Sequence, residues 1–143
     1  MTYVADSPVA RNYRQLGIQH DIETASPHRL IQMLMERVLT KVELARRNLL
    51  EERMAEKGRL IGDAINIVNG LQASLNHKAD EKMSANFDAL YAYMMRRLLE
   101  ANLRDEVEIL DEVSGLLQEL KEAWDAIAEQ VEGDSAAEEN LRS

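Results

Sequence analysis

Few side chains in this sequence have the types and the spacing that catalysis or metal binding requires. The 143 residues include three histidines, His20, His28 and His77, and no cysteine. A di-iron site in a helical bundle uses a glutamate three residues before a histidine, with both side chains projecting inward. None of the three histidines has such a glutamate on an apolar stripe. The sequence therefore predicts no metal site and no cofactor.

Arrangements for nucleophilic catalysis and nucleotide binding are also missing from the sequence. There is no glycine-rich nucleotide loop, and no Ser, His and Asp set whose placement suggests an activated nucleophile. Arg96, Arg97 and Glu100 could bind a small anion, although a surface charge network explains them more simply. We therefore predict that the protein is not an enzyme. The alternative, a small helical enzyme, would need charged side chains that face inward at the middle of the domain.

The charge balance argues against two classes of partner. The formal net charge is -9 and the isoelectric point is near 4.8, so most of the surface should repel nucleic acid and anionic lipid. No run approaches the ~20 consecutive apolar residues of a membrane-spanning helix, and the first residues lack the pattern of a secretory signal. We expect no nucleic acid partner and no membrane insertion.

Apolar residues recur at intervals of three and four from Ser26 onward, which predicts an all-α chain. The first helix should begin at Pro27, because Ser26 can cap its amino end and proline suits its first position. Short connections between long helices favour an elongated antiparallel up-down four-helix bundle. The apolar pattern places its helices at about 27–53, 57–76, 80–101 and 104–130.

The two ends of the chain do not share this pattern. Residues 1–25 are weakly periodic and are predicted to form a flexible N-terminal arm or cap. Its Tyr13, Ile18 and Ile22 are too few to stabilise a lone helix, so we expect them to dock on the bundle at 26–130 when no partner is bound. Residues 131–143 lack large apolar side chains apart from a single leucine, which predicts a disordered acidic tail.

The second predicted helix has one side without charge. Between Leu60 and Asn76 its only charged residue is Asp63. A glycine inside a helix costs about 1 kcal/mol relative to alanine, and this side carries two glycines whose cost should be offset. Either the glycines let helices pack closely inside the bundle, or they let the helix of a partner approach from outside. The side opposite the core consists of Gly62, Asn66, Asn69, Gly70 and Ala73.

Tyr91 and Tyr93 lie two positions apart in the third predicted helix, about 200° apart around its axis. Tyr91 falls on the flank of the apolar stripe, whereas Tyr93 falls near Arg97 and Glu100. We therefore predict that Tyr91 is buried and that Tyr93 faces outward. There the Tyr93 ring could contact a partner, or it could simply lie against Arg97 in solvent.

Four stretches of the sequence, in the same order and spacing, resemble the FliS family of flagellar secretion chaperones. A single stretch would be a weak signal, whereas four in register are specific. Together they cover the chain from about Tyr13 to Ile127. They are ETASPHRLIQML at 23–34, AINIVNGLQASLN at 64–76, LYAYMMRRLLEAN at 90–102 and LDEVSGLLQELKEAWDAI at 110–127.

This resemblance implies an antiparallel four-helix bundle that works as an export chaperone in the bacterial cytoplasm. It also implies that the bundle binds the C-terminal segment of newly made flagellin and prevents premature polymerisation of the filament. Delivery to the flagellar type III export apparatus would follow. The export gate and a co-chaperone are then further candidate partners.

We expect the partner to contact the arm and the uncharged sides of the second and third helices. The other candidate occupant of this surface is a second copy of the chain, so the protein should be a monomer or a weak homodimer. A homodimer would show a mass that depends on concentration. The candidate contact residues are Tyr13, Ile18, Ile22, Ile65, Asn66, Asn69, Gly70, Ala73, Tyr93 and Arg97.

Overall fold

The structure, a computed structural model, describes residues 26–75 and 81–142, with side chains described in 26–75 and 82–127. Within these ranges the chain is entirely helical, as predicted, and forms no strand. None of the described helices combines the length and the apolar content needed to cross a membrane. The helices are α2 at Pro27–Leu50, α3 at Met54–Ala73, α4 at Glu81–Arg104 and α5 at Val107–Arg142.

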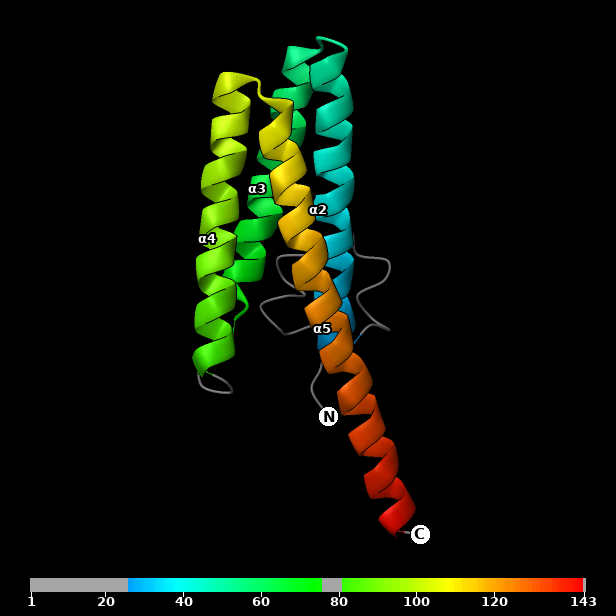
Figure 1. Ribbon diagram of the computed structural model, residues 1–143. Helices are drawn as coiled ribbons and strands as arrows, with labels where there is room; N and C mark the ends of the chain where they lie inside the picture. The colour runs from blue at the N-terminus through cyan, green and yellow to red at the C-terminus, as the bar shows by residue number, and fades with distance from the viewer. Residues whose placement is uncertain (1–25, 76–80, 143) are drawn as a thin grey trace.

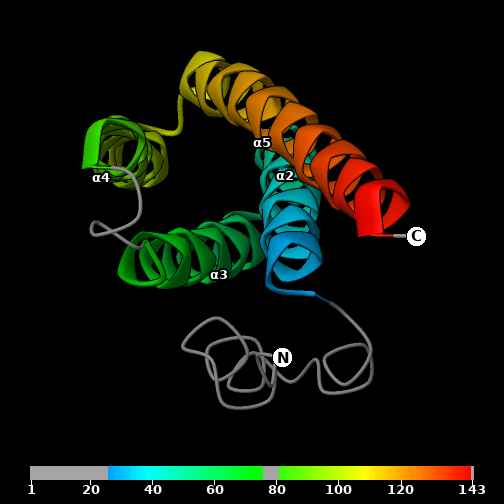
Figure 2. The ribbon, with the colours of Figure 1, turned by 90° about the horizontal axis from the view of Figure 1, so that it is seen from below.

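The four helices pack side by side as a bundle. In Figure 1 the chain rises along α2, descends along α3, rises along α4 and descends along α5. Helix α2 packs against α3 and α5, and α4 packs against the same two helices. Seen from below in Figure 2, α5 crosses over α2 as it descends. The neighbours of each helix around the bundle are therefore its neighbours along the chain, with α5 closing the ring on α2.

All four helices contribute one apolar stripe to a single core. The spacing of three and four residues puts these side chains on one side of each helix, which is why the sequence pattern identifies them. Two of these rows, on the neighbouring helices α2 and α5, are Leu30, Leu34, Val38, Val42, Ala45 and Leu49 of α2, and Leu110, Val113, Leu117 and Leu120 of α5.

The predicted start of α2 is confirmed. The Ser26 hydroxyl accepts the backbone N–H of Arg29 at 3.1 Å, and Pro27 occupies the first helical turn. The cap satisfies a donor that has no partner inside the helix.

The helix ends earlier than predicted, at Leu50. Glu52 adopts a left-handed backbone with φ 60, and the Arg53 N–H then reaches back to the Asn48 carbonyl at 2.8 Å. This is the Schellman closure of a helix, which is usually built on glycine and was therefore not visible in the sequence.

Helix α3 is shifted from its predicted range of 57–76, because it begins at Met54 and ends at Ala73. The predicted ranges leave residues 54–56 between the first two helices, but the connection is Glu51, Glu52 and Arg53. Lys57, in the first turn of α3, is 5% exposed and donates to the Asn102 carbonyl at 3.0 Å and to Asp105 Oδ1 at 2.5 Å. It thereby satisfies a carbonyl at the end of α4 and holds the turn into α5.

Helix α5 continues to Arg142, so its backbone does not follow the predicted end near residue 130 or the predicted disordered tail at 131–143. The added residues contain no proline, and seven of the twelve at 131–142 are alanine, glutamate, leucine or arginine, which favour a helix. The predicted arm at 1–25 lies outside the described residues.

Candidate partner-binding surface

The exposed side of α3 is built from small and amide side chains, and we call it the outer α3 face. It consists of Gly62, Asn66, Asn69, Gly70 and Ala73; the two asparagines and Ala73 are exposed, and the glycines are half-buried. No charged residue follows Asp63 within the helix. The predicted Ile65 is half-buried beside this face and packs against the core. The structure therefore brings together the predicted contact residues of α3.

Two side chains show how α3 is turned. On one flank, Asp63 Oδ2 forms an ion pair with Lys41 Nζ of α2 at 3.1 Å. On the other flank, Gln72 Nε2 donates to the Asp88 carbonyl of α4 at 3.4 Å. The outer α3 face lies between these flanks and points away from the core.

Gly62 distinguishes the two explanations for the glycines of this helix. Among the described residues, a Cβ atom built on Gly62 would meet nothing within 4 Å. No described helix therefore requires a glycine there, although the residue lowers the helix propensity of α3. Close packing among the described helices does not explain Gly62, and the other explanation, approach by the helix of a partner, stays a prediction.

Helix α4 adds two exposed leucines that were not among the predicted contact residues. Leu99 is 54% exposed and Leu103 is 76% exposed, and their spacing of four places them on one side of the helix. The Asn102 side chain lies against α3, since its Oδ1 would be 3.5 Å from a Cβ built on Gly58, and Leu99, three positions earlier, lies on the same flank of α4. The available signal in the sequence was the spacing of four that links Leu99 and Leu103 to Tyr91 and Met95.

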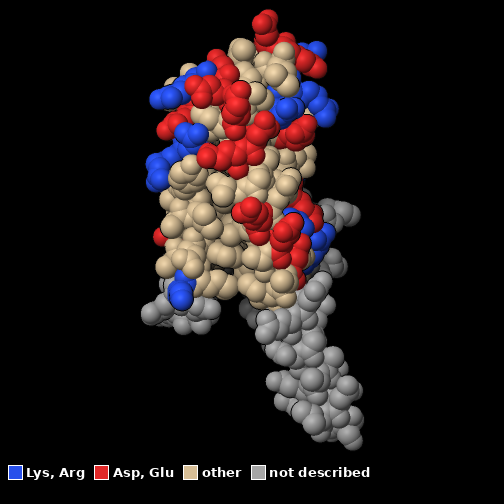
Figure 3. Space-filling view, in the orientation of Figure 1, with Lys and Arg blue, Asp and Glu red and all other residues tan. Residues whose placement is uncertain are grey.

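Charge is distributed unevenly along α4, and its least charged part lies toward the N-terminal end, away from Leu99 and Leu103. Figure 3 shows charged side chains gathered at the upper end of the visible face and around the lower part of α5. Most of the surface over the lower part of α4 is uncharged in this view. Uncharged alanines at positions 85, 89 and 92 fit this appearance.

The burial of Tyr91 is confirmed. Its side chain is 1% exposed and meets the Phe87 ring edge-to-face, with centroids 6.1 Å apart. Burial raises the pKa of the Tyr91 phenol well above its usual value.

Tyr93 faces outward, but toward α5. Its hydroxyl donates to Glu112 Oε2 at 3.0 Å, and Arg97 Nε donates to Glu112 Oε1 at 2.7 Å. The hydrogen bond from Arg97, with a further one from Tyr93, holds the pKa of Glu112 below its usual value. Arg97 also pairs with Glu100, while the Arg96 guanidinium lies 5.6 Å from the Tyr93 ring centre.

The predicted contact residues are therefore divided between two surfaces. Those of α3 form the outer α3 face, whereas Tyr93 and Arg97 lie where α4 meets α5. The predicted Tyr13, Ile18 and Ile22 lie outside the described residues.

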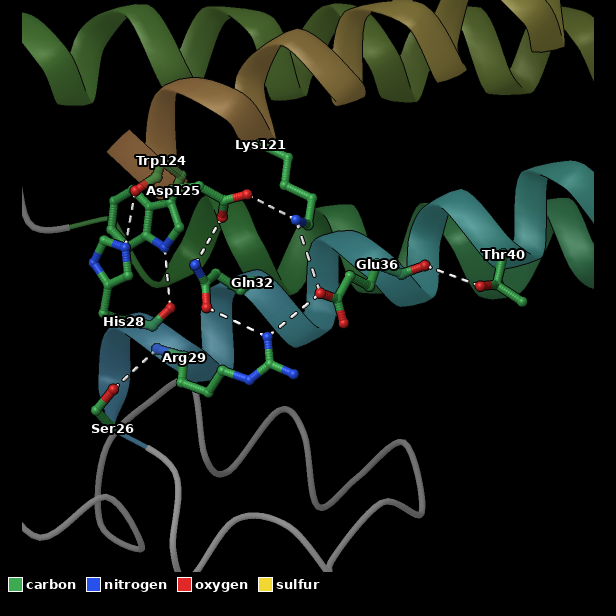
Figure 4. A network of polar contacts seen from close by, with 9 residues as sticks. All are labelled: Ser26, His28, Arg29, Gln32, Glu36, Thr40, Lys121, Trp124 and Asp125. Carbon is green, nitrogen blue, oxygen red and sulfur yellow. Dashed lines mark hydrogen bonds and ion pairs between the residues drawn. The ribbon is translucent and has the colours of Figure 1, made fainter. Parts of the chain in front are cut away.

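A polar seam joins the start of α2 to α5 (Figure 4). The rings of His28 and Trp124 stack at 4.2 Å, His28 Nε2 bonds to the Trp124 carbonyl at 2.9 Å, and Trp124 Nε1 donates to the His28 carbonyl at 3.0 Å. Beside them, Asp125 accepts from Gln32 at 2.7 Å and from Lys121 at 2.8 Å. His28 is half-buried, with the Trp124 ring stacked against its own.

This seam offers structural contacts and no nucleophile paired with a base. Among the described residues, no group of three or more His, Asp or Glu side chains is placed to hold a metal ion.

Comparison with known proteins identifies close relatives of the chain. The family model described as Flagellar protein FliS matches residues 9–131. The flagellar secretion chaperone FliSB of Pseudomonas aeruginosa is 43% identical over 118 residues, which are 82% of this chain and 94% of that protein. FliS of Salmonella typhimurium is 39% identical over 81% of this chain and 87% of its own length. FliS of Bacillus subtilis is 33% identical, with coverages of 74% and 78%.

Proposed function

Because this chain belongs to the FliS family of flagellar proteins, we propose that it is a cytoplasmic export chaperone for flagellin. It binds the C-terminal segment of flagellin, prevents premature polymerisation of the filament and assists delivery to the flagellar type III export apparatus. The relatives at 43% and 39% identity are named flagellar secretion chaperones, which supports this role. The export gate and a co-chaperone are further partners in this proposal.

One observation carries the proposed binding site, namely the open space above Gly62 on an uncharged helix side. Gly62 lowers the helix propensity of α3 although no described neighbour requires a glycine there, and a small residue on an exposed helix side lets another helix approach closely. The exposed Leu99 and Leu103 on the α3 side of α4 supply apolar area beside it. An amphipathic helix bound here would cover its apolar residues with those of the chaperone.

The architecture suits a task that needs binding and no turnover. The chain directions in Figure 1 support an elongated antiparallel up-down bundle, which offers a long surface to an extended segment. A segment that is unfolded on its own must pay the entropy of ordering when it binds, so it needs a large apolar surface to compensate.

The direct test compares two glycines at which an added Cβ atom would have no neighbour within 4 Å. Gly115 of α5 also has nothing within 4 Å of a built Cβ, but it lies away from the outer α3 face. We expect Gly62→Leu to weaken binding of the C-terminal segment of the organism's own flagellin at least tenfold, because the added side chain blocks close approach. Gly115→Leu should leave the affinity unchanged. Isothermal titration calorimetry measures both, and circular dichroism verifies the fold.

Two results would count against the proposal. If the wild-type chain does not bind the flagellin segment, the function is wrong. If it binds but Gly62→Leu and Gly115→Leu behave alike, the function stands and the site lies elsewhere. Sedimentation of the free protein detects a homodimer that competes for the same surface.

A further inference from the structure

A shallow groove runs along the outward side of α2, separate from the leucines of α4. Its volume is about 510 Å³. Apolar and cationic side chains alternate along it, with three basic residues and one acidic residue in its lining. The lining residues are Arg29, Met33, Glu36, Arg37, Thr40, Lys41 and Leu44.

Arg37 is the cation in this groove whose charge is not neutralised. Arg29 pairs with Glu36 at 3.4 Å, and Lys41 pairs with Asp63 at 3.1 Å. The half-buried Arg37 forms no ion pair with any residue that the structure describes. In a chain with a formal net charge of -9, such a guanidinium is a local binding point for an anionic group.

The spacing along α2 defines the chemistry that would fit. Met33, Arg37 and Lys41 are four residues apart, about 6 Å each along the helix. Leu44 provides a second apolar contact beyond Arg37. A complementary helix would present a carboxylate to Arg37, with one apolar residue about one turn away facing Met33 and another about two turns away facing Leu44.

The groove also adjoins the outer α3 face. Lys41 of the groove is bonded to Asp63, and Asp63, Asn66 and Gly70 follow one another at helical spacing on the same side of α3. A segment lying on the outer α3 face can therefore extend onto α2 without crossing another helix.

We infer that this groove binds a carboxylate of the flagellin segment, with Arg37 as its counter-ion. The inference rests on the proposed function, and it adds to the apolar site an ionic contact that selects where the segment lies. A single half-buried ion pair stabilises by up to about 1 kcal/mol and is weakened by salt.

The experiment measures affinity for the flagellin C-terminal segment at low and moderate salt. Arg37→Gln should weaken binding about fivefold at low salt, which corresponds to about 1 kcal/mol, and should flatten the salt dependence. Arg37→Lys should retain part of the affinity. The matched control is Arg47→Gln, because Arg47 is an exposed cation of α2 that does not line the groove; it should behave as the wild type.

Substitution of the segment's carboxylates by amides, one at a time, completes a double-mutant cycle. One amide variant should bind wild-type protein about fivefold more weakly and should bind Arg37→Gln no more weakly than the unaltered segment does. If Arg37→Gln and Arg47→Gln both bind like the wild type, the inference is wrong and the proposed function is intact. If the wild-type chain binds no segment, both are wrong.

The test also identifies other occupants of the groove. If Arg37→Gln leaves segment affinity unchanged but abolishes a concentration-dependent dimer, the groove contacts a second copy and the inference is overturned. If deletion of residues 1–25 makes the Arg37→Gln and wild-type affinities equal, the arm occupies the groove and the inference is again overturned.

Discussion

At the scale of single residues, α4 carries two tyrosines, two positions apart, of which one packs in the core and the other lies at the surface. Tyr91 is enclosed and meets Phe87, while Tyr93 is bound to Glu112 of the neighbouring helix at 3.0 Å. A buried ring contributes through the area it removes from water and through its contacts. A hydrogen bond at an exposed carboxylate contributes far less, because water can replace it.

The first prediction follows from this difference. Tyr91→Ala should lower the free energy of unfolding by about 3–5 kcal/mol, because it leaves a cavity in the core. Tyr93→Phe keeps the ring and removes only the hydroxyl, so its cost should stay below about 1 kcal/mol. Urea denaturation followed by circular dichroism measures both. A loss for Tyr93→Phe equal to that for Tyr91→Ala would contradict this prediction, because it would make the exposed Tyr93 hydroxyl as important to stability as the buried Tyr91 ring.

At the scale of the helices, both ends of α2 are stabilised by specific contacts and not only by propensity. Glu52 occupies the left-handed position of the Schellman closure with φ 60, a conformation that costs side chains other than glycine about 1–2 kcal/mol. The polar seam between α2 and α5 holds the first turn of one helix against the other.

The second prediction tests the closure of α2. Glu52→Gly should raise the free energy of unfolding by about 0.5–1 kcal/mol, since relief of the left-handed strain exceeds the added chain entropy of glycine. Glu51 has an ordinary φ of -89 and is the matched control, so Glu51→Gly should be neutral or destabilising. Thermal unfolding compares the two. Stabilisation by Glu51→Gly alone would contradict the assignment.

The third prediction concerns the pH dependence of the seam. Hydrogen bonds from Lys121 and then Gln32 keep the pKa of Asp125 below its usual value. A carboxyl with a lowered folded pKa stabilises the fold above its ordinary pKa of about 3.9, and that stability is lost as the pH falls through the lowered value. Asp125→Asn should therefore reduce the melting temperature at pH 6, with a difference from wild type that shrinks toward pH 3.

The size of this difference is small, because Asp125 is partly exposed and its ion pair is screened by solvent. Glu119→Gln is the control, since Glu119 is an exposed carboxylate of the same helix with no ion pair to the described residues. Its melting curves should follow those of the wild type across the pH range. A difference for Asp125→Asn that grows as the pH falls would contradict the sign.

At the scale of the whole molecule, α5 is longer than the helices that it packs against. In Figure 1, α5 continues beyond the other three helices before it ends near the C-terminus. The seam at Trp124 and Asp125 is the last described point at which α5 contacts α2 through side chains. A helix of a few turns is marginally stable in water on its own.

The fourth prediction follows from the extension of α5 beyond the other three helices. Removal of residues 131–143 should change the melting temperature by less than about 2 °C, because the core and the seam stay intact. Truncation before Lys121 removes Trp124 and Asp125 and should lower it strongly. Differential scanning calorimetry of the two truncations compares them. A large loss on removing only 131–143 would show that the far part of α5 packs on the bundle.

Local patterns in the sequence determined most of the helical framework. The apolar spacing identifies the stripes of α2 and α5, Ser26 with Pro27 identifies the start of α2, and the helical wheel distinguishes Tyr91 from Tyr93. These features depend on residues within one or two turns of each other, so the 3.6-residue period is enough to show them. The uncharged side of α3 was visible for the same reason.

Only the tertiary structure decided which residues of different helices meet. Lys57 is joined to Asp105, His28 to Trp124, and Tyr93 to Glu112, all across long separations in sequence. The rotation of each helix about its axis and the side on which the next helix packs determine these contacts, and neither is encoded in a local pattern. The open space above Gly62, and the division of the contact residues between two surfaces, depend on that same packing.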